Sequence, residues 1–297
     1  MARKIILRLI HFIEKITGKV IIVVDGAVAH KNNTAALSKD GFWYAGNVFN
    51  MANIAYGIAT KGAVEKHETV LVKKILDYIT SEKHLTSLYD IGANSGYYGI
   101  LSAFLYRDKI KVCSFEPLPE YVDCIKKSVY LNRLDNITIF QFGIGNKDEE
   151  KTMYLAGTGS TLENGFSGDN ITNTIKIPVK RIDGIVESNS IILPDFMKID
   201  VEGHELKVLQ GAESAIRKNK PVLFIEIACS LRAVGRSYIN SDYERTFVFL
   251  NKIGYKSYRI RGGKLCKFDY NDVPEYIDMY LFLHTDRHAQ LKDMLMK

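Results

Sequence analysis

Asp90 begins a glycine turn whose pattern suits a nucleoside, and a second acid, Glu116, follows at the end of the next predicted strand. The turn reads Asp90-Ile-Gly-Ala-Asn-Ser-Gly96 and follows a short apolar stretch. Glu116 stands where open α/β sheets place a carboxylate that accepts hydrogen bonds from two neighbouring ribose hydroxyls. Gly92 and Gly96 lack a Cβ where the chain must turn sharply and a ligand must approach the backbone. The spacing therefore predicts a nucleoside-containing ligand at this turn.

The same turn is poorly suited to a pyrophosphate. The dinucleotide fingerprint requires Gly-x-Gly-x-x-Gly, whereas three non-glycine residues separate Gly92 from Gly96. Asp90 adds negative charge at the mouth of the loop, which opposes a phosphate and favours a cation. S-adenosylmethionine combines a ribose with positive charge and has no phosphate. The predicted cofactor-binding residues are Asp90, Gly92, Ala93, Asn94, Gly96, Glu116 and Pro117, with backbone groups of Gly143 and Ile144 beside the adenine.

A second polar segment, Lys198-Ile-Asp-Val-Glu-Gly-His-Glu205, follows a predicted strand. Residues just past this strand should face the reactive end of the cofactor, because the strand adjoins the one that leads into the glycine turn. Methyl transfer to a hydroxyl requires alignment of the reacting groups and a base that removes the hydroxyl proton. Asp200 is the first candidate for this base, followed by His204 and then Glu202.

Each of these residues also has a structural alternative. Asp200 is able to cap the next helix or to hold Lys198. Glu202 and Glu205 suit the first turn of a helix, where the macrodipole favours negative charge. Asp200, Glu202 and His204 are residue types that bind a divalent ion, but ligands so closely spaced at a strand-to-helix turn seldom converge. No metal is therefore expected.

Three motifs in this order resemble the FkbM-type methyltransferases, S-adenosylmethionine-dependent enzymes with the class I fold. They are the Asp90–Gly96 turn, Phe115-Glu-Pro117 and Lys198–Glu205, and the last distinguishes this family from other methyltransferases. The likeness covers roughly residues 65–227. His204 stands where the family more often has a small or apolar residue, so the resemblance implies no role for it. The resemblance implies O-methylation of a sugar hydroxyl in a polysaccharide, glycolipid or secondary metabolite.

Two other functions remain open at this stage. An NAD-type dinucleotide-dependent oxidoreductase would need the missing Gly-x-Gly-x-x-Gly. A catalytically inactive methyltransferase-like binding module would retain Glu116 without turnover. The expected partner is a small-molecule or glycan acceptor. No nucleic acid is expected, because the net charge of +6 is modest and the 40 Lys and Arg residues form no dense run.

Strand and helix patterns alternate along the chain in the manner of βαβ units. The predicted helices cover residues 67–80, 97–106, a stretch from Pro119, and 202–218; the predicted strands cover 111–115, 137–142, 196–199, 222–227, 255–260 and 279–284, besides one leading into the glycine turn. A short connection with Gly262-Gly263 joins the last two strands, which should pair antiparallel. The resemblance implies an α/β, Rossmann-like, doubly wound, mostly parallel seven-stranded sheet with one antiparallel strand.

The pattern divides the chain into an N-terminal extension, residues 1–64, and an S-adenosylmethionine-binding domain, residues 65–297. The sequence of residues 146–192 does not fit a plain βαβ repeat. It predicts an inserted hairpin, whose tip is either a lid over the cofactor or a plain surface loop.

The N-terminal extension begins with an expected amphipathic helix. Apolar residues recur at helical spacing over residues 6–16, which favours packing on the protein's own domain over peripheral contact with a membrane. The longest uninterrupted apolar run there, residues 20–24, is too short to span a bilayer. The 4 cysteines show no metal-binding spacing, and a reduced, cytoplasmic protein is the simplest interpretation.

Overall fold

The computed structural model describes residues 28–30, 33–46, 54–164, 171–188, 190–228, 240–261, 264–271 and 278–296. The amphipathic helix predicted over residues 6–16 and the Gly262-Gly263 pair lie outside these ranges. Within them, no helix has the length and apolar character needed to cross a membrane.

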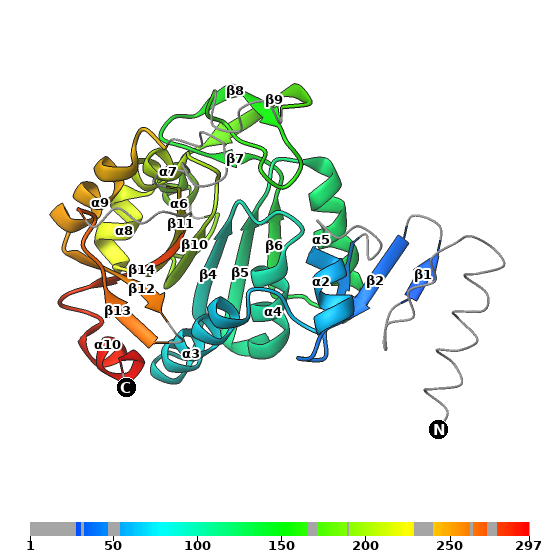
Figure 1. Cartoon of the computed structure of the whole chain (residues 1–297), viewed down its shortest axis with the longest axis horizontal. Helices are drawn as coiled ribbons and strands as arrows, with labels where there is room; N and C mark the ends of the chain where they lie inside the picture. The colour runs from blue at the N-terminus through cyan, green and yellow to red at the C-terminus, as the bar shows by residue number, and fades with distance from the viewer. Residues whose placement is uncertain are drawn as a thin grey trace.

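The central sheet, as far as these residues show it, has 8 strands in the order β13-β12-β14-β11-β10-β4-β5-β6 (Figure 1). Their bounds are β4 (Thr86–Ile91), β5 (Ile110–Phe115), β6 (Ile137–Phe140), β10 (Phe196–Ile199), β11 (Val222–Ile227), β12 (Tyr255–Arg261), β13 (Lys264–Lys267) and β14 (Asp278–His284). Strands β6, β5, β4, β10 and β11 are parallel, and β14 is antiparallel to both β11 and β12. The predicted doubly wound α/β fold is confirmed.

The sheet has one strand more than expected, because residues 264–267 form β13 at its edge. β13 pairs antiparallel with β12. Leu265 is buried, and the two end residues of the strand, Lys264 and Lys267, are exposed, as suits a short strand at the edge of a sheet. The interpretation of this stretch as a plain connection is therefore wrong.

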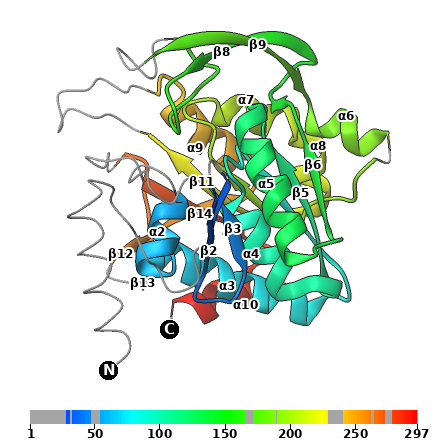
Figure 2. The ribbon, with the colours of Figure 1, turned by 90° about the vertical axis from the view of Figure 1, so that its right-hand side faces the viewer.

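Helices cover both faces of the sheet, and each face has its own apolar core (Figures 1 and 2). One face carries α3 (Lys66–Glu82), α4 (Tyr97–Tyr106), α5 (Pro119–Asn132) and α10 (Ala289–Leu295). The other face carries α6 (Ile182–Glu187), α7 (Glu205–Gly211), α8 (Glu213–Asn219) and α9 (Tyr243–Lys252). A 3₁₀ turn, η1 (Arg107–Lys109), follows α4. Leu88 belongs to the first core and Tyr89 to the second. This alternation buries β4 on both sides, as expected for a central parallel strand.

The helix predicted over residues 202–218 is two helices, α7 and α8, with a break at Ala212. An added Cβ at Gly211 would lie 1.9 Å from the carbonyl oxygen of Gly145, so α7 ends in close contact with another segment. Asp183 then accepts hydrogen bonds from the backbone N–H groups of Ser214 and Ala215, both at 2.9 Å. Because a side chain distant in sequence caps α8, the sequence around Ala212 gives little sign of the break.

A second, smaller sheet lies over the carboxyl ends of the central strands (Figure 2). Its order is β7-β9-β8, with β7 (Gly143–Ile144), β8 (Glu149–Leu155) and β9 (Asn173–Lys180). Strands β8 and β9 are antiparallel, and β7 runs parallel to β9. The strand predicted over residues 137–142 ends at Phe140, and the chain then joins this second sheet through β7.

The described part of the N-terminal segment forms β1 (Val28–His30), β2 (Asn33–Leu37), β3 (Trp43–Ala45) and α2 (Ile54–Lys61). Strand β3 is fixed to α5, because Asn132 accepts a hydrogen bond from the N–H of Trp43 and donates one to its carbonyl. Phe42 and Tyr44 are fully buried and belong to the same core as α3 and α4. The aromatic residues of this segment thus include two that pack in the main core.

Candidate functional site

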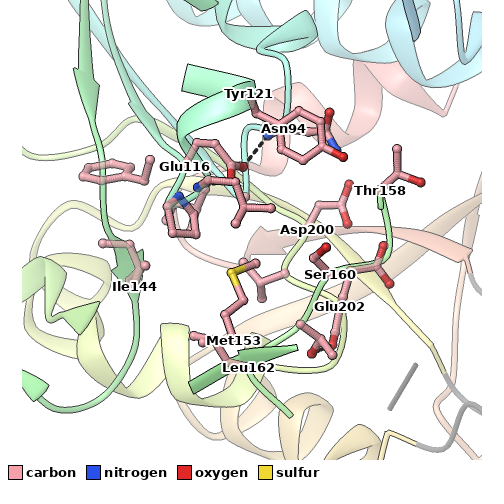
Figure 3. A pocket seen from close by; sticks show the side chains of 18 of the residues that line it. Asn94, Glu116, Tyr121, Ile144, Met153, Thr158, Ser160, Leu162, Asp200 and Glu202 are labelled. Carbon is pink, nitrogen blue, oxygen red and sulfur yellow. Dashed lines mark hydrogen bonds between the residues drawn. The ribbon is translucent and has the colours of Figure 1, made fainter. Parts of the chain in front are cut away.

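A pocket lies between the β8–β9 hairpin and the carboxyl ends of β4, β5 and β10 (Figure 3). The predicted site residues that line it are Gly92, Asn94, Glu116, Pro117, Gly143, Ile144, Asp200 and Glu202. Figure 3 shows Asp200 and Thr158 on one side of this pocket and Ile144 on the other. Four predicted residues are not part of its lining, namely Asp90, Ala93, Gly96 and His204. One cavity therefore contains both the ribose-binding candidate and two of the candidate bases.

Glu116 is the most deeply placed acid in this pocket, with 4% of its surface exposed. Its Oε2 accepts a hydrogen bond from the N–H of Asn94 at 2.8 Å, and its Oε1 accepts one from the N–H of Leu118 at 2.9 Å. Burial raises the pKa of Glu116 to about 7, although both bonds act to lower it. Each carboxylate oxygen keeps lone-pair capacity for a further donor, such as a ribose hydroxyl.

The backbone N–H groups of the glycine turn are already used by the protein. Gly92 and Ala93 both donate to the carbonyl of Phe115, at 3.0 and 3.1 Å, and Asn94 donates to Glu116. Asn94 adopts the left-handed conformation, with φ of 50°. A phosphate cradle needs free N–H groups that point at the ligand. The turn therefore does not offer one, in agreement with the expectation from its glycine spacing.

Asp90 does not lie at the mouth of the loop as predicted. It is 1% exposed, and its Oδ2 accepts a hydrogen bond from the N–H of Gly99 at 2.9 Å. Burial raises the pKa of Asp90, and the charge of Lys198 acts against this shift. The physical reason is the alternation of β4, which turns Asp90 away from the pocket and toward α4. Its role is to fix the start of α4 against the sheet.

The glycines of the turn make room for the protein itself. An added Cβ at Gly92 would lie 1.8 Å from the carbonyl oxygen of Asp200, and one at Gly96 would lie 2.8 Å from the side chain of Ile125. Both glycines have positive φ, 71° and 85°. The expected ligand approach is thus replaced by close packing between the turn, β10 and α5, although Gly92 does line the pocket.

Four ionisable side chains converge at the carboxyl ends of β10 and β11: Lys198 and Glu226 lie near the ends of these strands, and Asp200 and Glu202 follow β10. The Nζ of the buried Lys198 donates to Oδ2 of Asp200 at 2.9 Å. Burial and then the charge of Asp200 raise the pKa of Glu202 to about 8. The charge of Asp200, followed by burial, raises the pKa of Glu226 well above its usual range. With a pKa of about 8, Glu202 holds a proton through much of the neutral range, and a carboxylate at this place is able to accept a proton from a bound hydroxyl.

Carboxylate oxygens of Asp200, Glu202 and Glu226 lie within 4.8 Å of one another. A divalent ion fits such a set by ligand type. Asp200 and Glu202 come from a single turn, and the third group comes from the neighbouring strand β11. His204, the third member of the set considered from sequence, is not part of this group.

Glu202 precedes the helix in which the sequence placed it. Its φ is 52°, an unusual value for a residue with a side chain, and Gly203 follows with φ of 95°. Helix α7 begins only at Glu205, whose carboxylate accepts hydrogen bonds from the N–H of Gly203 and from Asn240, both at 2.8 Å. The macrodipole alternative therefore does not apply to Glu202. Strain of this kind persists where surrounding structure fixes it, often at functional sites.

His204 faces the hairpin instead of the pocket. Its side chain is 2% exposed, and Nδ1 lies 2.5 Å from Oε1 of Glu163. Its Nε2 lies 3.1 Å from the position of a Cβ added at Gly145. Burial lowers the pKa of His204, against the hydrogen bond to Glu163. The prediction of His204 as the second candidate base therefore loses its geometric basis.

Several residues of the site are absent from the predictions based on sequence. Glu163 contacts His204, Lys207 and Lys151, while Tyr121 and Leu118 line the pocket. The polar composition of residues 156–170 predicted a hairpin tip there, but nothing singled out Glu163. Its partners come from β8 and α7, and only folding brings these elements together.

The chain was compared with known proteins. Over 131 residues it is 27% identical to the hexuronic acid methyltransferase AglP of Haloferax volcanii, across 44% of this chain and 51% of that protein, so it spans about half the length of this curated relative. Among solved structures, methyltransferase FkbM from Methylobacillus flagellatus has a TM-score of 0.44 at 20% identity, over 68% of this chain and 44% of its own. The TYW2 protein of M. jannaschii in complex with AdoMet has a TM-score of 0.41 at 14% identity, over 90% of each chain.

A family model, described as the methyltransferase FkbM domain, matches residues 90–257. This range begins at Asp90, includes the pocket-lining residues of β5, β7, β8 and the segment after β10, and ends in β12. Because it covers more than half of the 297 residues, the chain belongs to the FkbM methyltransferase domain family.

Proposed function

We propose that this protein is an S-adenosylmethionine-dependent O-methyltransferase that acts on a sugar hydroxyl. The observation that carries this proposal is the shared pocket: Glu116 lines one part of it, and Asp200 and Glu202 line another. Membership of the FkbM family supports methyl transfer. The name of the relative, a hexuronic acid methyltransferase, supports a sugar as the acceptor.

The pocket fits this cofactor through its donor and acceptor groups. Glu116 is a buried carboxylate with capacity to accept hydrogen bonds from the two ribose hydroxyls. The apolar side chains of Phe115 and Ile144 supply surface for the adenine ring. The turn offers no N–H cradle for a pyrophosphate, which disfavours the NAD-type alternative. When bound, S-adenosylmethionine would supply a methyl group activated by a sulfonium. The carboxylate of Asp200 gives that positively charged end a favourable environment.

Asp200 is the residue to which we assign the general base. Lys198 occupies its Oδ2, which fixes the carboxylate. With 27% of its side chain exposed, Asp200 is accessible to an acceptor that enters from solvent. Glu202 is the second candidate, and its pKa of about 8 means that it holds a proton over much of the neutral range. His204 is not proposed as a base, because it is bound to Glu163 outside the pocket.

Calorimetry with S-adenosylhomocysteine and with NAD tests the cofactor assignment. We expect binding of S-adenosylhomocysteine and none of NAD. Tight NAD binding, or no binding of S-adenosylhomocysteine, would overturn the proposal. Binding without methyl transfer to the methyl glycosides of glucose and glucuronic acid would favour the catalytically inactive binding module over an enzyme with these acceptors.

Asp200→Asn tests the assignment of the base. Loss of a positioned general base lowers turnover by on the order of 100- to 10,000-fold, and we expect the affinity for S-adenosylhomocysteine to change little. The release of S-adenosylhomocysteine, measured with the acceptor on which the wild type is active, reports turnover. Asp123→Asn changes an exposed carboxylate on α5 and serves as the matched control. Near wild-type turnover in Asp200→Asn would assign the base elsewhere, with Glu202→Gln as the next variant.

A further inference from the structure

A short loop after β8 forms one wall of the pocket. Its residues Thr158, Ser160, Thr161 and Leu162 line the cavity. The loop is tied back to β8 by reciprocal backbone hydrogen bonds between Tyr154 and Thr161, at 2.8 and 3.0 Å. Its position decides how closely the pocket surrounds a ligand.

Two contacts connect this loop to the segment that carries the candidate base. The first is the hydroxyl of Thr161, which donates to the carbonyl of Glu202 at 2.5 Å; Thr161 is 1% exposed. The second is Glu163, whose Oε1 accepts from Nζ of Lys207 at 2.5 Å and lies 2.5 Å from Nδ1 of His204. Nζ of Lys151 on β8 lies 3.7 Å from the same oxygen.

Hydrogen bonds to the charged carboxylate of Glu163 hold His204 and Lys207 beside it. Burial opposes the charge of Glu163, but hydrogen bonds from His204 and Lys207 outweigh it and lower its pKa to about 2. Glu163 is thus ionised throughout the neutral range. Burial keeps the pKa of His204 low, so its Nδ1 acts as a neutral donor to the carboxylate. Charge-assisted hydrogen bonds of this kind are the stronger ones.

We propose that Glu163 is a positioning residue that fastens the pocket-lining loop to helix α7 and thereby sets the shape of the cofactor pocket. His204, the residue directly before α7, takes part as a second donor. This assignment explains why a buried histidine stands two residues after Glu202 without facing the pocket. It rests on the function proposed above only for the identity of the bound ligand.

Glu163→Gln tests this role, because it keeps the shape of the side chain and removes its charge. We expect amide hydrogen exchange of residues 156–162 to accelerate, and the affinity for S-adenosylhomocysteine to fall, each by about tenfold or more. The affinity change should appear mainly as faster dissociation with a nearly unchanged association rate, because a looser pocket wall holds a bound ligand less well while the encounter with the pocket changes little. A role in folding alone would not alter dissociation in this selective way.

Glu150→Gln is the matched control, since Glu150 is an exposed carboxylate on β8 outside this group. Lys207→Gln removes one positive charge beside Glu163 and should give a smaller change in the same direction, which keeps the test open if Glu163→Gln folds poorly. Unchanged exchange and dissociation in both variants would overturn the role of Glu163, while wild-type binding of S-adenosylhomocysteine would still support the proposed function. If the wild type does not bind that ligand, the exchange measurements still decide whether Glu163 fastens the loop.

Discussion

Glu116, the residue proposed to bind the ribose, has a built-in dependence on pH. Two backbone N–H groups hold its carboxylate, yet burial raises its pKa to about 7. Hydrogen bonds from ribose hydroxyls favour the charged form and so lower the pKa when a ligand binds. Ligand affinity is therefore linked to loss of the Glu116 proton. The free protein must release this proton before it binds the ligand with full affinity.

We expect the affinity for S-adenosylhomocysteine to fall below pH 7, by up to about tenfold per pH unit. At pH 8, Glu116→Gln should weaken binding by on the order of 10- to 150-fold, because a hydrogen bond to a charged group is lost, and should flatten the pH profile. Calorimetry from pH 5.5 to pH 8 measures both effects.

The exposed Glu120 on α5 gives the control, Glu120→Gln, which should retain the wild-type profile. Glu202 and Glu205 also have raised pKa values, about 8 and about 7, so the difference between wild type and Glu116→Gln isolates the contribution of Glu116. A wild-type affinity that does not change over this range would contradict the assigned linkage.

At the scale of elements, the site depends on how closely β4 and β10 end beside each other. Gly92 has a φ of 71°, and the carbonyl of Asp200 lies 1.8 Å from the position of its missing Cβ. The glycine turn and the segment with the candidate base are therefore in direct contact. A side chain at position 92 would move the two apart.

Gly92→Ala and Gly157→Ala separate the two effects of a side chain at such a glycine. Gly157 also has positive φ, 63°, but its Cβ would meet nothing within 4 Å. Gly157→Ala should lower the free energy of unfolding by about 1 to 2 kcal/mol, from the left-handed conformation alone. Gly92→Ala should lower it by about 1 to 3 kcal/mol more, because of the clash. Urea denaturation measures both, and equal losses would show that the contact with Asp200 is unimportant.

Elements defined by local sequence could be predicted with their bounds. The strands Phe196–Ile199 and Val222–Ile227 and the helix Tyr97–Tyr106 occur as expected, because each is an apolar run bounded by polar or glycine residues. The break between α7 and α8 could not be predicted, because it depends on the close contact of Gly211 with Gly145 and on the hydrogen bonds that α8 donates to Asp183. Strand β13 was not predicted, because its four residues directly follow the pair Gly262-Gly263 and so resemble part of a turn.

At the scale of the whole molecule, the fold extends beyond the part that matches the family model. Strand β14 follows residue 257, yet it lies between β11 and β12 in the sheet. Helix α10 packs on the same face as α3, and Tyr78 donates a hydrogen bond to Gln290 at 3.2 Å. The C-terminal residues are therefore part of the core that supports the site.

Leu291→Ala tests this dependence. Leu291 is fully buried, whereas Met294 on the same helix is 41% exposed. Leu291→Ala should lower the free energy of unfolding by about 2 to 5 kcal/mol through lost burial and the cavity left behind. Met294→Ala should stay within about 0.5 kcal/mol of the wild type. Denaturant unfolding followed by circular dichroism gives both values, and similar losses would mean that α10 is only peripheral.

The sequence by itself determined the fold class, the family and the order of the motifs, because these depend on local patterns of apolar residues, glycines and acids. It also predicted that Glu116 and Asp200 would lie at one edge of a sheet, since the carboxyl ends of parallel strands share an edge. Only the tertiary structure decided which acids face the pocket. Strand alternation turned Asp90 inward, β11 brought Glu226 to Asp200, and the hairpin placed Glu163 on His204. These contacts join segments far apart in the chain, and no local pattern encodes them.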